Sequence, residues 1–411
     1  MIPRPPAARA LAALLLLVPA ASLPAQEKPA CAPGNGGLTL PAGFCATVLA
    51  EDARGARQLA VAPGGVLYVA MEDGDAGVLA LRDRDGDGRA EERVGFGPAG
   101  ANDVEVHDGY LYAALPDRIL RWRLAERALA PDDAPEIIVG GLPDDGNHKA
   151  KSIAFGASGA MYVTIGSASN SCQQADRQAG SPGRDPCREL ERRAGIWLFA
   201  AARPGQRFAD GRRYATGLRN ALALAVQPGT GALFAAVNGR DQLGDNWGFS
   251  DEANAENPAE ELVAVEDGDD FGWPYCYYST EYRKKVLAPE YGGDGRKVGR
   301  CAEAKDPLVA FPAHWAPLAL AFSTGDAFGP EYREGLFVAF HGSWNRAPRP
   351  QSGYRVAFVP MKNGAPADEF QTFAIGGTAT ALRASGLAVG ADGSLFIASD
   401  GVGKVWKVVR R

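Results

Sequence analysis

The sequence predicts an all-β protein, a six-bladed β-propeller with long loops on one face. One pattern recurs six times: an apolar triplet, a turn of Gly, Asp or Pro, and then a second β-rich run that contains an aromatic residue. Each copy is typical of a β-hairpin. A single hairpin cannot bury both of its faces, and a linear stack would leave sheet edges open, whereas radial closure solves both problems. A globular sandwich is the structural alternative.

The six copies begin at Leu59, Val104, Ile153, Leu224, Leu320 and Leu387, and their aromatic residues are Tyr68, Tyr112, Tyr162, Phe234, Phe337 and Phe396. Residues 26–411 provide about 64 residues per blade, more than the roughly 40–50 of compact propellers, so long loops must project. The longest insertion is expected between Phe234 and Phe337. We expect the segment FCATVLA near Phe44 to pair with KVWKVV near Val405 and so close the ring.

The N-terminal residues predict a secretory signal peptide over 1–25. Arg4 and Arg9 precede a short apolar run, and small residues then lead to Ala25, the expected cleavage site. An N-terminal membrane anchor is the alternative, although the run is short for a span. Residues 26–411 are predicted to be a single propeller domain, periplasmic or secreted, and no later stretch is long and apolar enough to cross a membrane.

The chain has 6 cysteines, which lie in the sequence as near neighbours. Exported proteins keep disulfides, so we predict three local bridges, although six cysteines allow 15 pairings. The predicted bridges are Cys31–Cys45, Cys172–Cys187 and Cys276–Cys301. Metal binding by these residues is the alternative, but no Cys-x-x-Cys or Cys/His cluster is present.

Composition and missing motifs exclude several functions. The 43 basic and 49 acidic residues give a net charge of −6 without a basic tract, which argues against a nucleic-acid partner. No G-x-G-x-x-G follows a strand, and no G-x-S-x-G or H-E-x-x-H is present. The segment with Asp83, Asp85 and Asp87 resembles a calcium loop but has Val94 where an EF-hand has Glu. It is either a solvated turn or a structural Ca²⁺ site.

Polar residues recur in register with the apolar triplets, at the two strand ends that share one rim of a propeller. Before the first strands stand His148, Arg219, His314 and Arg383, and after the second strands stand Ser167, Asn238 to Asp241, His341 to Arg346, and Asp400. Any one of them could merely decorate a loop. A concave mouth lined by His, Arg and Trp suits a planar, polyanionic small molecule.

Several stretches together are distinctive: GNHKAKSIAF, TIGSASNS, GLRNALALAVQPGTG, VNGRDQLGDN, DFGWPYCY and FHGSWNR. In this order, and from about Leu40 to the C-terminus, the chain resembles the glucose/sorbosone dehydrogenase family, most of all its L-sorbosone dehydrogenase-like branch. The resemblance implies a propeller that binds pyrroloquinoline quinone and Ca²⁺ at its mouth. It also implies oxidation of a sugar or sugar aldehyde by hydride transfer to the quinone, with an external electron acceptor such as a cytochrome or a quinone.

The resemblance also implies roles for individual residues. His148 matches the catalytic base, Arg219 the arginine at the quinone carbonyls, and Arg383 an arginine that binds a carboxylate. Asn220 and Asn238 match cofactor contacts, while the backbone carbonyls of Gly239 and Arg240 match Ca²⁺ ligands. The further candidates for cofactor contact are Lys151, His314, His341, Trp344 and Arg346.

One position departs from the family pattern. Ser167 stands where the glucose enzymes have an aspartate that supports the base, and no acidic residue is expected at the rim near His148. Because Arg219 and Lys151 are expected nearby, we predict a pKa of His148 below the usual 6.5 or so. The alternative functions are a propeller that binds a ligand or a protein without catalysis, and a Ca²⁺-dependent lactonase, which would need acidic ligands in the channel.

Overall fold

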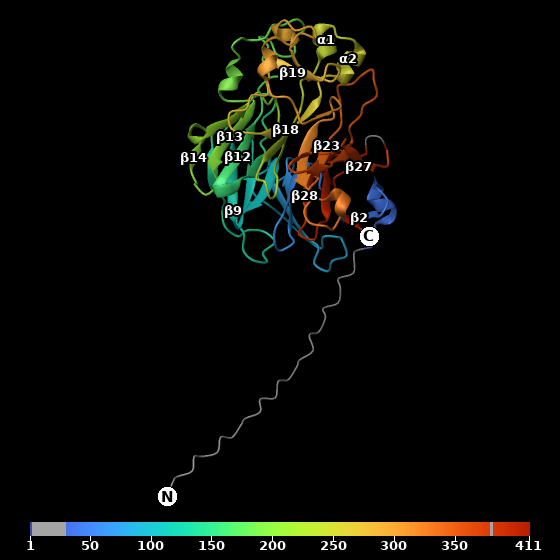
Figure 1. The fold of residues 1–411 in the computed structure, drawn as a ribbon. Helices are drawn as coiled ribbons and strands as arrows, with labels where there is room; N and C mark the ends of the chain where they lie inside the picture. The colour runs from blue at the N-terminus through green and yellow to red at the C-terminus, as the bar shows by residue number, and fades with distance from the viewer. Residues whose placement is uncertain (2–29, 379–380) are drawn as a thin grey trace.

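Six β-sheets stand around a common axis and confirm the predicted six-bladed propeller (Figure 1). The structure is a computed structural model that describes Met1, residues 30–378 and residues 381–411. The predicted signal peptide therefore lies outside the described residues, Met1 excepted. No helix in the described part of the chain is long and apolar enough to cross a membrane.

Each blade is a meander of four strands. Blade 1 consists of β3 (Ala56–Val61), β4 (Leu67–Met71), β5 (Val78–Arg82) and β6 (Glu92–Phe96), and blade 2 of β7 (Asp103–His107), β8 (Tyr110–Ala114), β9 (Arg118–Arg123) and β10 (Glu136–Gly140). Blade 3 consists of β11 (Ile153–Phe155), β12 (Ala160–Ile165), β13 (Gly195–Ala200) and β15 (Arg212–Thr216), and blade 4 of β16 (Ala223–Val226), β17 (Leu233–Val237), β18 (Glu260–Val265) and β21 (Val309–Phe311). Blade 5 consists of β22 (Pro317–Phe322), β23 (Leu336–Phe340), β24 (Arg355–Val359) and β27 (Gln371–Gly376), and blade 6 of β28 (Ala384–Val389), β29 (Leu395–Ser399), β30 (Lys404–Arg410) and β2 (Phe44–Ala50).

Short elements extend or cover these sheets. β14 (Gln206–Arg207) pairs with β10, and β1 (Leu38–Thr39) pairs with β27. The others are the hairpins β19 (Cys276–Ser279) with β20 (Lys284–Leu287) and β25 (Met361–Lys362) with β26 (Ala365–Pro366), the helices α1 (Leu243–Trp247) and α2 (Asp251–Glu256), and the 3₁₀ turns η1 (Pro33–Gly37), η2 (Ala157–Gly159), η3 (Arg188–Glu191), η4 (Phe208–Asp210), η5 (Pro289–Tyr291), η6 (Gly299–Glu303) and η7 (Pro330–Tyr332).

The repeated aromatic residue has a constant partner on the innermost strand. Tyr68 faces Ala60, Phe234 faces Ala225, and equivalent aromatic–alanine pairs recur in blades 3, 5 and 6. The small methyl group leaves room for the ring, which then packs against the next blade. Blade 2 is the exception, because Glu105 faces Tyr112.

The hydrophobic core consists of clusters between neighbouring blades. Tyr68 packs with Leu111 between blades 1 and 2, and corresponding clusters fill the other five junctions. The junction of blades 6 and 1 holds Leu49, Leu67 and Phe396, so apolar packing continues around the full ring.

The ring closes as predicted. The N-terminal strand β2 pairs antiparallel with the C-terminal β30, with Phe44 opposite Arg410. This pairing covers an edge of β30 that would otherwise expose its backbone N–H and C=O groups.

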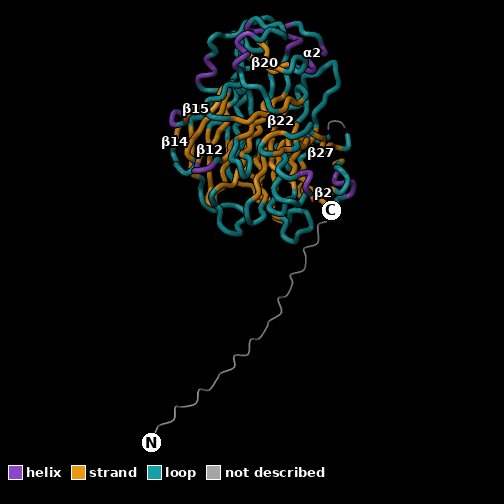
Figure 2. Tube along the Cα trace, viewed as in Figure 1, coloured by secondary structure: helices purple, strands orange, loops and turns teal. Residues whose placement is uncertain are grey.

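The long loops gather at one end of the propeller. Figures 1 and 2 show α1, α2 and the hairpin β19–β20 together above the strands, and we call this region, residues 166–194, 238–259 and 266–308, the cap. All three predicted disulfides are formed, and two of them, Cys172–Cys187 and Cys276–Cys301, lie in the cap. The predicted single-sided placement of long loops is confirmed.

Candidate functional site

His148 lies where the chain enters blade 3, half-buried and held by Ser167. Its Nδ1 is 3.0 Å from the Ser167 carbonyl oxygen and 2.9 Å from the Ser167 Oγ. The Ser167 hydroxyl donates its hydrogen to the Ser169 carbonyl at 2.6 Å, so Oγ has only lone pairs left for the imidazole. Two acceptors at Nδ1 place the ring hydrogen on Nδ1 and leave a lone pair on Nε2.

A glycine makes this approach possible. A Cβ atom on Gly166 would lie 2.6 Å from the His148 Cβ and 3.1 Å from the Asn220 Oδ1. Only glycine therefore lets the end of blade 3 meet both residues.

Burial and two arginines keep the His148 imidazole neutral. Burial is the main cause, and the charges of Arg219 and Arg177 add to it, so the pKa of His148 falls to about 3. The predicted direction is thus right, and Arg219 contributes as predicted, but Lys151 is not among the main causes of the lowered pKa. The expectation that no acid lies near it was wrong, since the charge of Asp241 raises the pKa of His148 in part.

Arg219 is buried, and its guanidinium is fully engaged with the protein. Nε donates to the Asn170 carbonyl at 3.0 Å, and Nη2 donates to the Asn170 Oδ1 and the Asp241 Oδ2, both at 3.0 Å. Nη1 donates to the carbonyls of Gly239 at 2.6 Å and Asn238 at 3.4 Å. Although burial opposes it, the charges of Arg219 and Arg177 hold the pKa of Asp241 below its usual value.

The remaining residues of blade 4 continue this group. The Asn220 carbonyl accepts hydrogen bonds from the backbone N–H of Asn238 at 2.9 Å and from its Nδ2 at 3.2 Å. Gly239 donates its N–H to Glu260 at 2.7 Å, and its carbonyl is taken by Arg219. The Arg240 carbonyl accepts no hydrogen bond from the described residues, while the Arg240 side chain turns away into the cap.

A second polar group lies between blades 5, 6 and 1, across the ring from His148. Asp400 is its centre: the His341 Nε2 is 2.8 Å from one carboxylate oxygen, and the Arg57 Nη1 is 3.3 Å from the same oxygen. Arg383 lies 3.6 Å from the other oxygen and 3.1 Å from the His341 ring. Burial alone would raise the pKa of Asp400, but His341 and the two arginines lower it.

Four predicted residues lie outside these two groups. Lys151 is fully buried, and its charged neighbours are Arg193 and Asp117, Asp144 and Asp145; burial lowers its pKa to about 7. His314 is buried and its Nε2 contacts the Asn254 carbonyl at 2.8 Å, although its Nδ1 is 3.9 Å from Asp241.

The other two come from the segment after β23. Arg346 is buried and bonds the carbonyls of Ala255 and Ala313 and the side chain of Glu256, so it fastens α2 to blade 5. Trp344 is 64% exposed and belongs to neither group.

Sequence reasoning missed Asn170, Arg177, Glu290 and Arg57. Asn170 is fully buried and joins Arg219 to Asp241, whose backbone N–H it accepts at 2.9 Å. Glu290 binds the Arg240 guanidinium at 2.6 Å. Asp241 and Asp400 stand at strand ends of the repeat, where their register placed them at the rim, whereas Asn170, Arg177 and Glu290 come from inserted loops without a repeat.

The acidic turn between β5 and β6 is separate from the mouth. Carboxylate oxygens of Asp83, Asp85, Asp87 and Glu91 lie within 4.8 Å of one another. Asp83 also accepts backbone N–H groups of Gly86 and Gly88, as a solvated turn would. Glu91 is an addition to the three aspartates named from the sequence.

The chain matches the TrAA12-like family over residues 38–411. Pyrroloquinoline quinone-dependent pyranose dehydrogenase of Coprinopsis cinerea is 29% identical over 190 residues, which are 38% of this chain and 25% of that protein. The matches span only 25% to 38% of the length of the first curated relatives.

Solved structures share the fold. A calcium structure of a Trichoderma reesei protein of carbohydrate-active enzyme family AA12 has a TM-score of 0.76 at 19% identity, covering 91% of this chain and 97% of that one. The holo form of the pyranose dehydrogenase quinone domain from Coprinopsis cinerea has a TM-score of 0.74 at 20% identity, covering 94% and 99%.

Proposed function

The chain belongs to the TrAA12-like family, and from that membership we propose that it is an exported dehydrogenase that oxidises a sugar or sugar aldehyde. The proposed cofactors are pyrroloquinoline quinone and Ca²⁺, bound at the mouth beside His148. The relatives named for this quinone support the proposal, as does the shared fold. An aldose or a sorbosone-like aldehyde is the proposed substrate, and the electron acceptor is proposed to be a separate protein or small quinone.

The residues at the mouth fit these cofactors. Within the described residues the Arg240 carbonyl has no hydrogen-bond donor, so both of its lone pairs are available to Ca²⁺, whereas the Gly239 carbonyl already accepts a hydrogen bond from Arg219. Arg383 contacts His341 and Asp400 across the ring, but its side chain is 48% exposed and can therefore also bind a carboxylate of the quinone. Asn220 and Asn238 frame the site from blade 4.

When bound, the quinone accepts a hydride and Ca²⁺ polarises its carbonyl groups. The protein supplies the base. His148 accepts the proton of the substrate hydroxyl at Nε2, because Ser167 keeps the hydrogen on Nδ1. Arg219 and Asp241 fix the blade 4 carbonyls in place.

The observation that carries this proposal is the hydrogen bonding of Ser167. A serine lacks the charge of an aspartate, yet its occupied hydroxyl sets the tautomer that a general base needs. Proton abstraction beside an anionic cofactor requires a histidine with an available Nε2 near arginines, and among the residues that the structure describes none hydrogen-bonds to the His148 Nε2.

Reconstitution tests the proposal. The purified protein, freed of metal, should take up about one quinone per chain in the presence of Ca²⁺, measured by fluorescence titration, and then reduce a dye with aldoses or osones. Arg383→Ala should weaken quinone binding by tenfold or more, since a charge-assisted hydrogen bond contributes about 1.5–3 kcal/mol. Arg333→Ala, which removes an exposed arginine far from the mouth, serves as the control. Absence of quinone uptake by the wild type would refute the function.

A further inference from the structure

Arg177 is held in an unusual backbone conformation within the loop closed by Cys172–Cys187. Its φ is +57°, a region that non-glycine residues rarely adopt. The Gln173 Oε1 accepts the Arg177 N–H at 2.9 Å, and the Gln173 Nε2 donates to the carbonyls of Gln178 and Ser181. Backbone strain of this kind concentrates at functional sites, which indicates a functional role for the Arg177 side chain.

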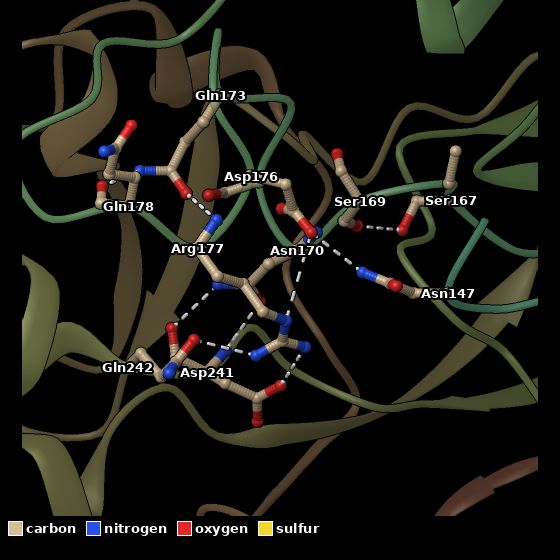
Figure 3. Close-up of polar contacts among 12 residues, drawn as sticks. Asn147, Ser167, Ser169, Asn170, Gln173, Asp176, Arg177, Gln178, Asp241 and Gln242 are labelled. Atoms are coloured by element: carbon tan, nitrogen blue, oxygen red, sulfur yellow. Dashed lines mark hydrogen bonds and ion pairs between the residues drawn. The ribbon is translucent and has the colours of Figure 1, made fainter.

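The loop closed by Cys172–Cys187 directs the Arg177 side chain toward Asp241 and Gln242, at the end of blade 4. Nη1 donates to the Gln242 Oε1 at 2.8 Å and Nη2 to the Asp241 Oδ2 at 3.0 Å, while Nε is 4.0 Å from Asp176 (Figure 3). Asp176 in turn accepts a hydrogen bond from Asn147, the neighbour of His148, at 2.9 Å. The charge of Arg177 reaches His148, because it contributes to the lowered pKa of that residue.

Arg177 differs from Arg219 in its exposure and in the number of its N–H groups that have an acceptor among the described residues. The Arg219 side chain is 5% exposed and its N–H groups all have protein acceptors, whereas the Arg177 side chain is 30% exposed. A guanidinium has five N–H groups, and within the described residues only two of those of Arg177 have an acceptor at hydrogen-bond distance. Three N–H groups therefore remain on a guanidinium whose direction is fixed by Asp241 and Gln242, and Asp176 and Asn147 connect it to the segment of His148.

We propose that Arg177 is a carboxylate-binding residue of the mouth, which binds a carboxylate presented next to His148. A planar guanidinium with free donors binds a carboxylate through two parallel hydrogen bonds. The carboxylate belongs either to an acidic sugar, such as a uronic acid, or to the quinone. This inference rests on the proposed function.

Two measurements on Arg177→Gln separate the sources. If the carboxylate is the quinone's, the affinity of the metal-loaded protein for pyrroloquinoline quinone falls about tenfold or more. If it is the substrate's, quinone affinity stays within twofold, and kcat/KM for D-glucuronate falls at least about tenfold more than kcat/KM for D-glucose, which reports any general effect on His148. No change in either measurement overturns the proposal.

Control variants keep the test interpretable. Arg184→Gln changes an arginine of the same loop whose hydrogen-bond acceptors, within the described part of the chain, are the backbone carbonyls of Gln173 and Gln174, and it should behave like the wild type. Arg177→Lys keeps the charge but not the paired donors, so it should recover only part of the loss. If the glutamine variant does not fold, a lysine variant that matches the wild type in both measurements overturns the proposal.

Failure of the proposed function can be distinguished from failure of the proposal that Arg177 binds a carboxylate. If the wild type takes up no quinone, calorimetric titration with D-glucuronate and D-glucose tests Arg177 directly. Binding of glucuronate alone, lost in Arg177→Gln, supports the carboxylate site; no binding of glucuronate to the wild type refutes it.

Discussion

At His148, both acceptors on the Nδ1 side belong to Ser167, and the hydroxyl that provides one of them is itself committed to Ser169. Ser167→Ala removes one acceptor and leaves the carbonyl. We expect turnover to fall about three- to tenfold, the effect of one neutral hydrogen bond of about 0.5–1.5 kcal/mol, while quinone affinity stays constant. Steady-state kinetics with a parallel quinone titration measure both, and an unchanged kcat would show that the tautomer is set elsewhere.

The low pKa of His148 predicts an unusual pH profile. Neutral imidazole accepts the proton, and with a pKa of about 3 it remains neutral at pH 5, so kcat/KM should not fall between pH 8 and 5 through this group. Ser167→Asp introduces an opposite charge, which favours the imidazolium and raises the pKa, so its profile should fall at a higher pH than that of the wild type. Coincident profiles for the two proteins would contradict this description of the site.

At the scale of elements, the cap is fastened by a buried ion pair. Arg240 from the end of blade 4 binds Glu290 of η5, and Ser171 and Trp247 donate to the same carboxylate at 2.8 and 2.9 Å. Glu290→Gln leaves Arg240 buried without a counter-charge and should cost about 3–5 kcal/mol in the free energy of unfolding. Urea titration measures the loss.

The matched control is the exposed pair of Arg300 and Asp185, 2.9 Å apart. Arg300→Gln should cost less than about 1 kcal/mol, because water already screens the charges. Equal losses in the two variants would show that the cap does not depend on the Glu290 contacts.

The same contrast explains which elements were predictable from the sequence. Because the hairpins repeat, Tyr68 and Phe234 can be recognised as the same position of one pattern. The disulfides follow from cysteines that are near neighbours in the sequence. The cap does not repeat: Glu290 meets Ser171 across 119 residues and Arg240 across 50. No local pattern encodes those contacts, and the nearness of Lys151 to His148 in the sequence does not show that the Lys151 side chain is buried near Arg193 and three aspartates.

At the scale of the whole molecule, the ring depends on the contact between its ends. Trp406 of β30 is 3% exposed, packs in the cluster between blades 5 and 6, and donates to the Gly36 carbonyl at 3.2 Å. Trp406→Ala should lower the free energy of unfolding by about 3–5 kcal/mol, since it leaves a large cavity. Trp406→Phe retains most of the packing and should cost clearly less, and an alanine variant as stable as the wild type would refute closure through β30.

The proposal that this propeller is a quinone-dependent sugar dehydrogenase depends most directly on His148. The decisive measurement compares His148→Ala with the wild type after both are loaded with quinone and Ca²⁺. The variant should bind the quinone within a few-fold of the wild type, because His148 is proposed to contact the substrate hydroxyl. Its turnover with the best sugar should fall about 10²- to 10⁴-fold, the usual contribution of a general base. A variant that retains more than about a tenth of wild-type turnover would contradict the role assigned to His148.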